Sequence, residues 1–346
     1  MRQLMFDAPG RVRWEEAADP VIADPAAAIV RPIAVATCDI DVGALRGVYP
    51  LTGPYPLGHE GVAEVVEVGD AVVDVGVGDR VVVPFQISCG SCGACQRGRT
   101  GNCEAHPKLS TFGLGAMGGF EWGGLLADLA LVPHADAMLV AVPDHIDATT
   151  VASASDNIPD AWRCVGPQLA AEPGAEVLVC GGDGGPNSIG LYAAGLALAA
   201  GASRVVYLDH DATRLQIAEA LGVEAVEARE FPRKVGAFAI TVDASGSESG
   251  LRCALESTAF DGWCTSPSVY LQDPSLPMFS MYSRCCTLHT GRVHARPAIP
   301  AVLAAVDAGF DPGKVTSAVV DWDDAESALA EPPLKLVISR SNVSST

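Results

Sequence analysis

The chain has 346 residues, 49% hydrophobic and 18% charged, which is the balance of a globular protein of about two domains rather than of a disordered chain. Its 42 acidic and 22 basic residues give a net charge of -20, which repels nucleic acid phosphates and anionic lipid headgroups. We therefore expect no nucleic-acid partner and no membrane partner. The charge names no substrate, because a solvated acidic surface accounts for it equally well.

The N-terminal part of the chain is expected to consist mainly of strands. Residues 1–16 alternate like a pair of strands and lack the pattern of a signal peptide, which predicts a cytoplasmic protein. Short alternating runs such as "GVAEVVEVG" and "DRVVVPF" continue to about residue 150, separated by Gly and Pro turns. This pattern predicts a strand-dominated first domain.

Four cysteines in residues 89–103 follow the spacing C-x2-C-x2-C-x7-C: Cys89, Cys92, Cys95 and Cys103. Such spacing lets four thiolates converge on one tetrahedral zinc ion within a loop. Four thiolates leave no open coordination position, so we expect this zinc to brace the loop and to take no part in catalysis. The cysteines without ligand spacing are expected to be buried thiols: Cys164, Cys180, Cys253, Cys264, Cys285 and Cys286.

The period of the pattern changes from about residue 157. The continuous apolar strand "AEVLVCGG" is followed by the helix "SIGLYAAGLALAAG", the strand "RVVYLD" and the helix "DATRLQIAEALG". This βαβ unit predicts a doubly wound parallel sheet over residues 157–289. The last 55 or so residues mix a short helix, "AIPAVLAAVDAG", with terminal strands.

Glycines join the first strand of this unit to its helix. A strand that runs into glycines and then into a helix can hold a pyrophosphate on the helix amides. Here the pattern is Gly182-x-Gly184-x5-Gly190, three residues longer than G-x-G-x-x-G. The enlarged turn leaves open whether Gly181, Gly182 or Gly184 faces the pyrophosphate.

The second strand of the unit ends in Asp209, nineteen residues after Gly190. A carboxylate there can accept both ribose hydroxyls of NAD and would repel the 2'-phosphate of NADP, which predicts NAD as the cofactor. The alternative for Asp209 is the N-cap of the next helix. Arg214 is expected either over the adenosine ribose or as a solvated helix charge.

The segment "PYPLGHEGVAEVVEVGDAVVDVGVGDRVVVP" precedes the cysteine loop. It resembles the Gly-His-Glu signature and the Gly-Asp-Arg-Val strand of zinc-containing medium-chain dehydrogenases/reductases of the alcohol dehydrogenase type, and the resemblance covers nearly the whole chain. It implies an α/β fold with a strand-rich GroES-like catalytic domain, residues 1–156 completed by 290–346, and a Rossmann domain, residues 157–289. It also implies two zinc ions per chain, NAD and a homodimer or homotetramer.

The same resemblance implies a catalytic zinc bound by Cys38, His59 and Asp156. A thiolate, an imidazole and a carboxylate leave a fourth position open to water or substrate. Taken singly, each of these residue types is more often structural than a ligand. Glu60 and Asp41 resemble carboxylates that orient the histidine ligand.

The chain departs from the family pattern beside this metal site. Many relatives have a Ser or Thr two residues after the first ligand that relays a proton to solvent, whereas this chain has Ile40. Asp39 stands where relatives often have a small or basic residue. Our hypothesis is that the missing hydroxyl is replaced by a water, by Asp39 or by Asp160, which follows Asp156 by one helical turn.

Three further residues keep two interpretations each. Phe85 and Trp122 are expected either to line the substrate pocket or to pack in the core or a loop. Lys335 is expected either near the cofactor phosphates or as a surface lysine.

The implied reaction is hydride transfer between a small-molecule alcohol and NAD⁺, with the zinc lowering the pKa of the alcohol. Two alternatives stay open. One is a dismutase of the same fold that retains its NAD, and the other is a zinc- and NAD-binding sensor or assembly protein without turnover.

Overall fold

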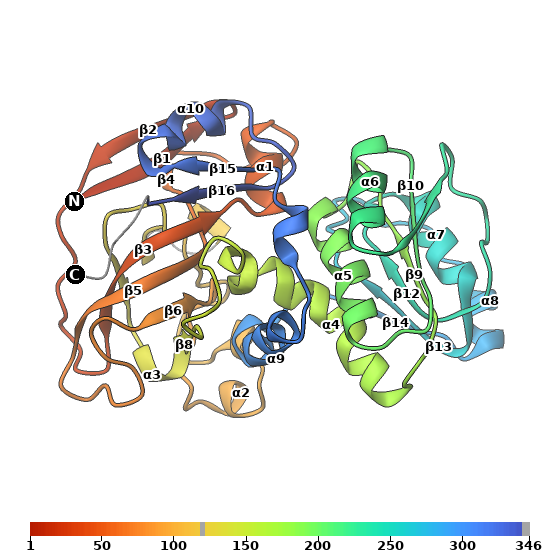
Figure 1. The fold of residues 1–346 in the computed structure, drawn as a ribbon, viewed down its shortest axis with the longest axis horizontal. Coiled ribbons are helices and arrows are strands. Elements are labelled where there is room, and N and C mark those ends of the chain that lie inside the picture. Colours follow the sequence, from red (N-terminus) through yellow and green to blue (C-terminus); the bar gives the residue numbers. More distant parts are fainter. Residues whose placement is uncertain (118–121, 341–346) are drawn as a thin grey trace. The chain divides into compact units, whose positions relative to one another are not determined.

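The computed structural model describes residues 1–117 and 122–340. It divides into two compact units (Figure 1). Unit 1 comprises Met1–Pro159, Val293–Leu303 and Thr316–Thr346, and unit 2 comprises Asp160–Arg292 and Ala304–Val315. Two helices pass from unit 1 into unit 2: α4 (Asn157–Ala171) and α9 (Ala295–Asp307). Among the described residues, no helix combines the length and the apolar composition needed to cross a bilayer.

Unit 1 is dominated by strands, as the alternating runs predict. The first two strands, β1 (Arg2–Ala8) and β2 (Arg11–Glu16), form the expected antiparallel pair. Together with β4 (Tyr55–Pro56) they form a three-stranded sheet in the order β2-β1-β4. A second, seven-stranded sheet has the order β15-β16-β3-β5-β6-β8, with β7 paired to β3.

The remaining elements of unit 1 are short, apart from the two long strands β3 and β5. The strands are β3 (Ala28–Ala36), β5 (Glu60–Val68), β6 (Arg80–Val83), β7 (Ala130–Val132), β8 (Val140–Ala141), β15 (Ala318–Asp321) and β16 (Leu336–Ser339). The α-helices are α1 (Asp39–Leu45), α2 (Gly93–Gln96), α3 (Ala135–Met138) and α10 (Ala325–Ala330). Short 3₁₀ turns lie at Thr100–Asn102, Gly115–Met117, Ala152–Ser155 and Trp322–Asp324.

Unit 2 holds a six-stranded parallel sheet in the order β11-β10-β9-β12-β13-β14. The βαβ unit that the sequence predicts is confirmed as β9, α5, β10 and α6. The strands are β9 (Val177–Cys180), β10 (Val205–Asp209), β11 (Glu224–Glu227), β12 (Phe238–Asp243), β13 (Thr258–Ser266) and β14 (Thr287–Thr290). The helices are α5 (Asn187–Ala199), α6 (Ala212–Ala220), α7 (Glu248–Ser257) and α8 (Met278–Arg284), with a 3₁₀ turn at Pro312–Val315.

Strand order places a switch point at β9. From β9 the chain continues to β10 and β11 on one side, and β12, β13 and β14 lie on the other. Right-handed crossovers in opposite directions put α5 and α6 on one face of the sheet and α7 on the other (Figure 1). Doubly wound sheets bind their ligands at the carboxyl ends of the strands beside such a point.

Local sequence explains how α6 begins. Asp211 is its N-cap, with Oδ1 accepting a hydrogen bond from the backbone N–H of Arg214 at 2.8 Å. The alternative that Asp209 caps this helix is therefore wrong. Asp209 ends β10 two residues earlier, and its carboxylate is used in another way that is described below.

One prediction about the cysteines is also wrong. Cys285 is exposed and Cys286 is half-buried, whereas Cys164, Cys180, Cys253 and Cys264 are buried as expected. Cys285 ends α8 as a left-handed C-cap with φ of 54°. A C-cap on a short surface helix faces water, which its residue type does not reveal.

Candidate functional site

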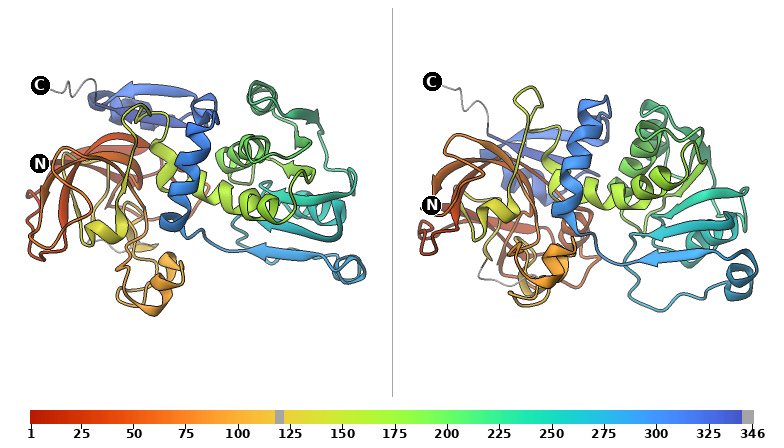
Figure 2. Two further views of the ribbon diagram at one scale, coloured as in Figure 1. Left: turned by 60° about the horizontal axis from the view of Figure 1, so that its bottom comes forward. Right: turned by 90° about the horizontal axis from the view of Figure 1, so that it is seen from below.

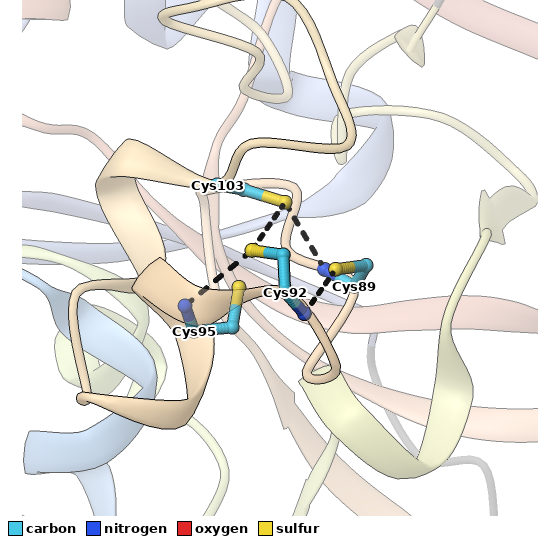
Figure 3. A group of neighbouring side chains, drawn as sticks. All are labelled: Cys89, Cys92, Cys95 and Cys103. Carbon is cyan, nitrogen blue, oxygen red and sulfur yellow. Dashed lines mark hydrogen bonds between the residues drawn. The ribbon is translucent and has the colours of Figure 1, made fainter.

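The four cysteines of the loop come together in unit 1. Their sulfur atoms all lie within 4.8 Å of one another (Figure 3). The segment around α2, drawn in orange, extends from the strands of unit 1 in both views of Figure 2. Backbone N–H groups point at the sulfurs, as they do in loops that bind metal: Cys92 N to Cys89 Sγ at 3.3 Å, Cys89 N to Cys103 Sγ at 3.4 Å, and Glu104 N to Cys92 Sγ at 3.3 Å.

These sulfurs fit a zinc ion chemically. Hydrogen bonds from the amides of Glu104 and Cys95 lower the pKa of Cys92 to about 6, which favours its thiolate. Burial raises the pKa of Cys95 to about 12, so its thiolate needs a nearby positive charge. A divalent cation among the four sulfurs supplies that charge.

A second cluster of possible metal ligands lies in the same unit. Cys38, His59 and Asp156 offer ligand atoms within 4.8 Å of one another, and all three side chains are buried. Cys38 Sγ is 3.4 Å from Asp156 Oδ2, which in turn is 3.5 Å from His59 Nε2. The fold thus joins three residues that are far apart in the sequence.

Each member of this trio is positioned by its own turn. Cys38 is the N-cap of α1, where its N–H donates to Asp41 Oδ2 at 3.1 Å. His59 follows Gly58, whose φ is +92° and whose added Cβ would lie 2.6 Å from the backbone N of Leu126. Only glycine meets both conditions, which is a physical reason for the Gly before the His.

The third member of the trio, Asp156, follows a 3₁₀ turn, Ala152–Ser155, that is hydrogen-bonded to β5. The Ser155 hydroxyl accepts from Gly61 N at 2.8 Å and donates to Gly61 O at 3.0 Å. Since Gly61 lies two residues after His59, this pair of bonds fixes Asp156 beside the histidine.

The charges around the trio also fit a cation. Neither ring nitrogen of His59 has a hydrogen-bond partner among the described residues, although Asp41 Oδ1 lies 3.5 Å from Nδ1. Burial lowers the pKa of His59, but the neighbouring carboxylates, led by Asp41, raise it to about 9. Burial, followed by the charge of Asp156, raises the pKa of Cys38 well above its usual value. A bound dication reverses both tendencies, because it favours the thiolate and the neutral imidazole.

One residue beside the trio, Asn157, was not predicted from the sequence. Asn157 lies directly against it, with Oδ1 at 3.0 Å from Cys38 Sγ and Nδ2 donating to Asp39 Oδ2 at 3.1 Å. Asn157 N also donates to Glu60 Oε1 at 3.1 Å. Its position next to Asp156 was the only available signal.

Lys335 corrects an expectation. It is not a surface lysine, because its side chain is 0% exposed, and it lies in unit 1. Nζ donates to Glu60 Oε2 at 2.8 Å and to Thr37 O at 2.6 Å. Glu60 is therefore held by Lys335 and Asn157, while Asp41 is the carboxylate that faces His59 Nδ1.

An apolar group lies beside the trio. Ile40 packs against a buried cluster of Phe85, Leu114, Val293 and Ala295, and the Phe85 and His59 rings are 5.9 Å apart. Trp122 was expected either to line the substrate pocket or to pack in the core or a loop, and the structure shows the packing role. It packs against the main core of unit 1, and its ring meets His106 edge-on at 5.2 Å.

In unit 2 the predicted nucleotide residues meet at the carboxyl ends of β9 and β10. The glycine loop is closely packed: an added Cβ on Gly185 would lie 1.9 Å from Ala244 O, the residue after β12. Asp209 is fully buried and forms a bidentate ion pair with Arg214, through Nε at 2.8 Å and Nη2 at 2.7 Å. Arg214 is thus no solvated charge. Gly190 lies on α5, where a Cβ would lie 2.8 Å from Ala244 Cβ.

The carboxylates considered for proton transfer have different surroundings. Asp160, in unit 2, forms an ion pair with Arg163 within α4. Asp39, in unit 1, is half-buried at the start of α1 and accepts from Asn157.

Comparison with known proteins gives a consistent picture. The family profile described as "Alcohol dehydrogenase GroES-like domain" matches residues 24–144. A Mycobacterium tuberculosis protein named probable zinc-binding alcohol dehydrogenase is 28% identical over 338 residues, 95% of this chain and 85% of that protein. A formaldehyde dismutase of Pseudomonas putida is 33% identical over 211 residues, 59% of this chain and 51% of that protein. Among solved structures, an alcohol dehydrogenase from Thermus sp. ATN1 aligns with a TM-score of 0.84 at 27% identity and covers 99% of this chain and 100% of its own.

Proposed function

The chain belongs to the zinc-containing medium-chain dehydrogenase/reductase family, and we propose that it transfers a hydride between an alcohol and a nicotinamide dinucleotide, NAD⁺ in preference to NADP⁺. The observation that carries this proposal is the buried trio of Cys38, His59 and Asp156. One thiolate, one imidazole and one carboxylate are a ligand set of catalytic zinc sites that leave a position for substrate.

When bound, zinc supplies Lewis acidity to the alcohol oxygen, and the nicotinamide supplies the hydride acceptor. The residues of this chain hold and shape the site. Asp41 orients the His59 ring from its Nδ1 side, where their atoms are 3.5 Å apart. The apolar side chains of Ile40 and Phe85 exclude water from the side of the trio that they cover.

We assign to Asp39 the transfer of the alcohol proton to solvent. It is half-buried and connected to the trio through Asn157, which lies against Cys38. Asp160 is already neutralised by Arg163, which favours Asp39 over it.

The test is a panel of primary and secondary alcohols with NAD⁺ and NADP⁺, followed by absorbance at 340 nm. We expect reduced cofactor to form with at least one alcohol, more efficiently with NAD⁺, to stop after chelation and to return with added zinc. No reduced cofactor across the panel would instead favour the sensor or assembly protein.

Similarity to a formaldehyde dismutase keeps that activity as the second candidate. A dismutase uses the same site but regenerates its dinucleotide in place. NAD that stays with the protein through gel filtration, with turnover of an aldehyde without added cofactor, would replace the first proposal by this one. We also propose that the protein is cytoplasmic and forms a homodimer or a homotetramer. The same chromatography tests the oligomeric state.

The four-cysteine loop has its own expected result. We propose that Cys95→Ser lowers the zinc content from two ions per chain to one and destabilises the protein by about 3 kcal/mol or more, because the loop then keeps buried thiols without the ion. Elemental analysis and thermal unfolding measure both effects. Cys285→Ser is the matched control, since it removes an exposed thiol outside the loop. Two zinc ions per Cys95→Ser chain would contradict the assignment.

A further inference from the structure

The glycine loop passes directly over the carboxylate of Asp209. An added Cβ on Gly181 would lie 2.3 Å from Asp209 Oδ2 and 2.4 Å from the Tyr207 hydroxyl oxygen. Only glycine fits at this position. The loop and the end of β10 therefore form one structure at the carboxyl edge of the sheet, where a doubly wound fold holds its dinucleotide.

Asp209 already has many hydrogen-bond donors. Its side chain is 0% exposed. Both of its oxygens accept hydrogen bonds within unit 2: from Tyr207 Oη at 2.9 Å, His210 N at 2.7 Å, Asp211 N at 3.1 Å, Arg214 Nε at 2.8 Å and Arg214 Nη2 at 2.7 Å. Little of its acceptor capacity is left for a ribose.

Asp183, in the middle of the glycine loop, presents a second carboxylate at the same place. Its Oδ1 accepts from Arg214 Nη2 at 2.8 Å, and its Oδ2 lies 2.9 Å from His210 Nε2. The side chain is nevertheless 72% exposed, whereas that of Arg214 is 7% exposed. One guanidinium nitrogen thus bridges the buried carboxylate of Asp209 and the exposed one of Asp183.

We propose that Asp183 is a second determinant of dinucleotide choice, which excludes a 2'-phosphate by its charge and by occupying Arg214 and His210. The inference rests on the proposed function, because it concerns the same nucleotide site. An arginine fork and an imidazole are groups that bind a phosphate well. In this chain a carboxylate of the glycine loop already takes both, so a phosphate would have to displace it against like charge.

Removal of the Asp183 charge should therefore change two affinities in different ways. Asp183→Asn removes the charge that competes with an added phosphate for Arg214 Nη2 and His210 Nε2, and we expect about tenfold tighter binding of adenosine 2',5'-bisphosphate. Adenosine 5'-monophosphate lacks the 2'-phosphate, so its affinity should stay within about twofold or weaken. These two nucleotides correspond to the adenosine halves of NADP and NAD.

The experiment is calorimetric titration of both nucleotides into the wild-type protein and the variants. Asp183→Ser repeats the loss of charge with a different side chain, and thermal unfolding checks that each variant is folded. Asp211→Asn is the matched control. It removes one carboxylate from the start of α6, where Asn caps as well as Asp and where Asp211 bonds the backbone N–H of Arg214.

Three results would overturn the proposal. Equal changes for both nucleotides in the Asp183 variants would mean that Asp183 only shapes the loop. The same increase in affinity for adenosine 2',5'-bisphosphate with Asp211→Asn would mean that the overall negative charge, rather than Asp183, sets the choice of dinucleotide. If the wild-type protein binds neither nucleotide, the loop is no adenosine site. None of these titrations needs zinc or an alcohol. If the nucleotides bind as expected but no alcohol of the panel is oxidised, the proposed activity is wrong and the inference about Asp183 stands.

Discussion

Replacing His59 with Asn is expected to lower kcat/KM for alcohol oxidation by about a thousandfold or more, and to reduce the zinc content from two ions per chain to one. The reason is the isolation of the His59 ring. Both ring nitrogens are buried and have no hydrogen-bond partner among the described residues, while two carboxylates stand 3.5 Å away. A ring held in this way is poised to bind a cation between itself and Asp156, and its amide replacement cannot provide the same ligand.

The measurement combines steady-state kinetics with elemental analysis of the same preparation. His145→Asn is the matched control, because His145 is an exposed histidine of the same unit, outside the trio. We expect the control to keep both zinc ions and its activity. Activity retained by His59→Asn, or lost with both zinc ions still bound, would contradict the role given to His59.

Replacing Lys335 with Met is expected to lower the free energy of unfolding by about 3–5 kcal/mol, the typical cost of removing one partner from a buried ion pair. Lys335 and Glu60 are both 0% exposed, and Nζ lies 2.8 Å from Oε2. Without the lysine, the Glu60 carboxylate keeps only the N–H of Asn157 among its hydrogen bonds described above. The turn that carries Asp156 and Asn157 should loosen as well, so kcat/KM should also fall.

Denaturant unfolding with the zinc content held constant measures this effect. Lys314→Met is the matched control, since Lys314 is an exposed lysine whose Nζ donates only to Ala220 O at 2.9 Å among its hydrogen bonds described by the structure. The double variant Glu60→Gln with Lys335→Met removes both charges and should recover part of the lost free energy of unfolding. A Lys335→Met protein as stable as the Lys314→Met protein would show that the ion pair contributes little.

Much of the fold could be predicted because it depends on local pattern. The buried strand β9, the apolar helix α5 and the strand β10 are contiguous in sequence, and their periods identify them. The spacing of the four cysteines predicts their convergence for the same reason, since all of them lie in one short loop. Cys285 shows the limit of such reasoning, because a residue type alone does not tell whether a C-cap faces water.

The sequence by itself determined the parallel sheet of unit 2, the strand-rich character of unit 1 and the cysteine loop, since each follows from neighbouring residues. Only the tertiary structure decided what Lys335, Asn157 and Asp209 do. Lys335 reaches Glu60 across 275 positions of sequence, and Asp209 is surrounded by donors from its own strand end and from α6. Partners of buried charges are set by the packing of distant segments, and a single sequence carries no local mark of which segments will meet.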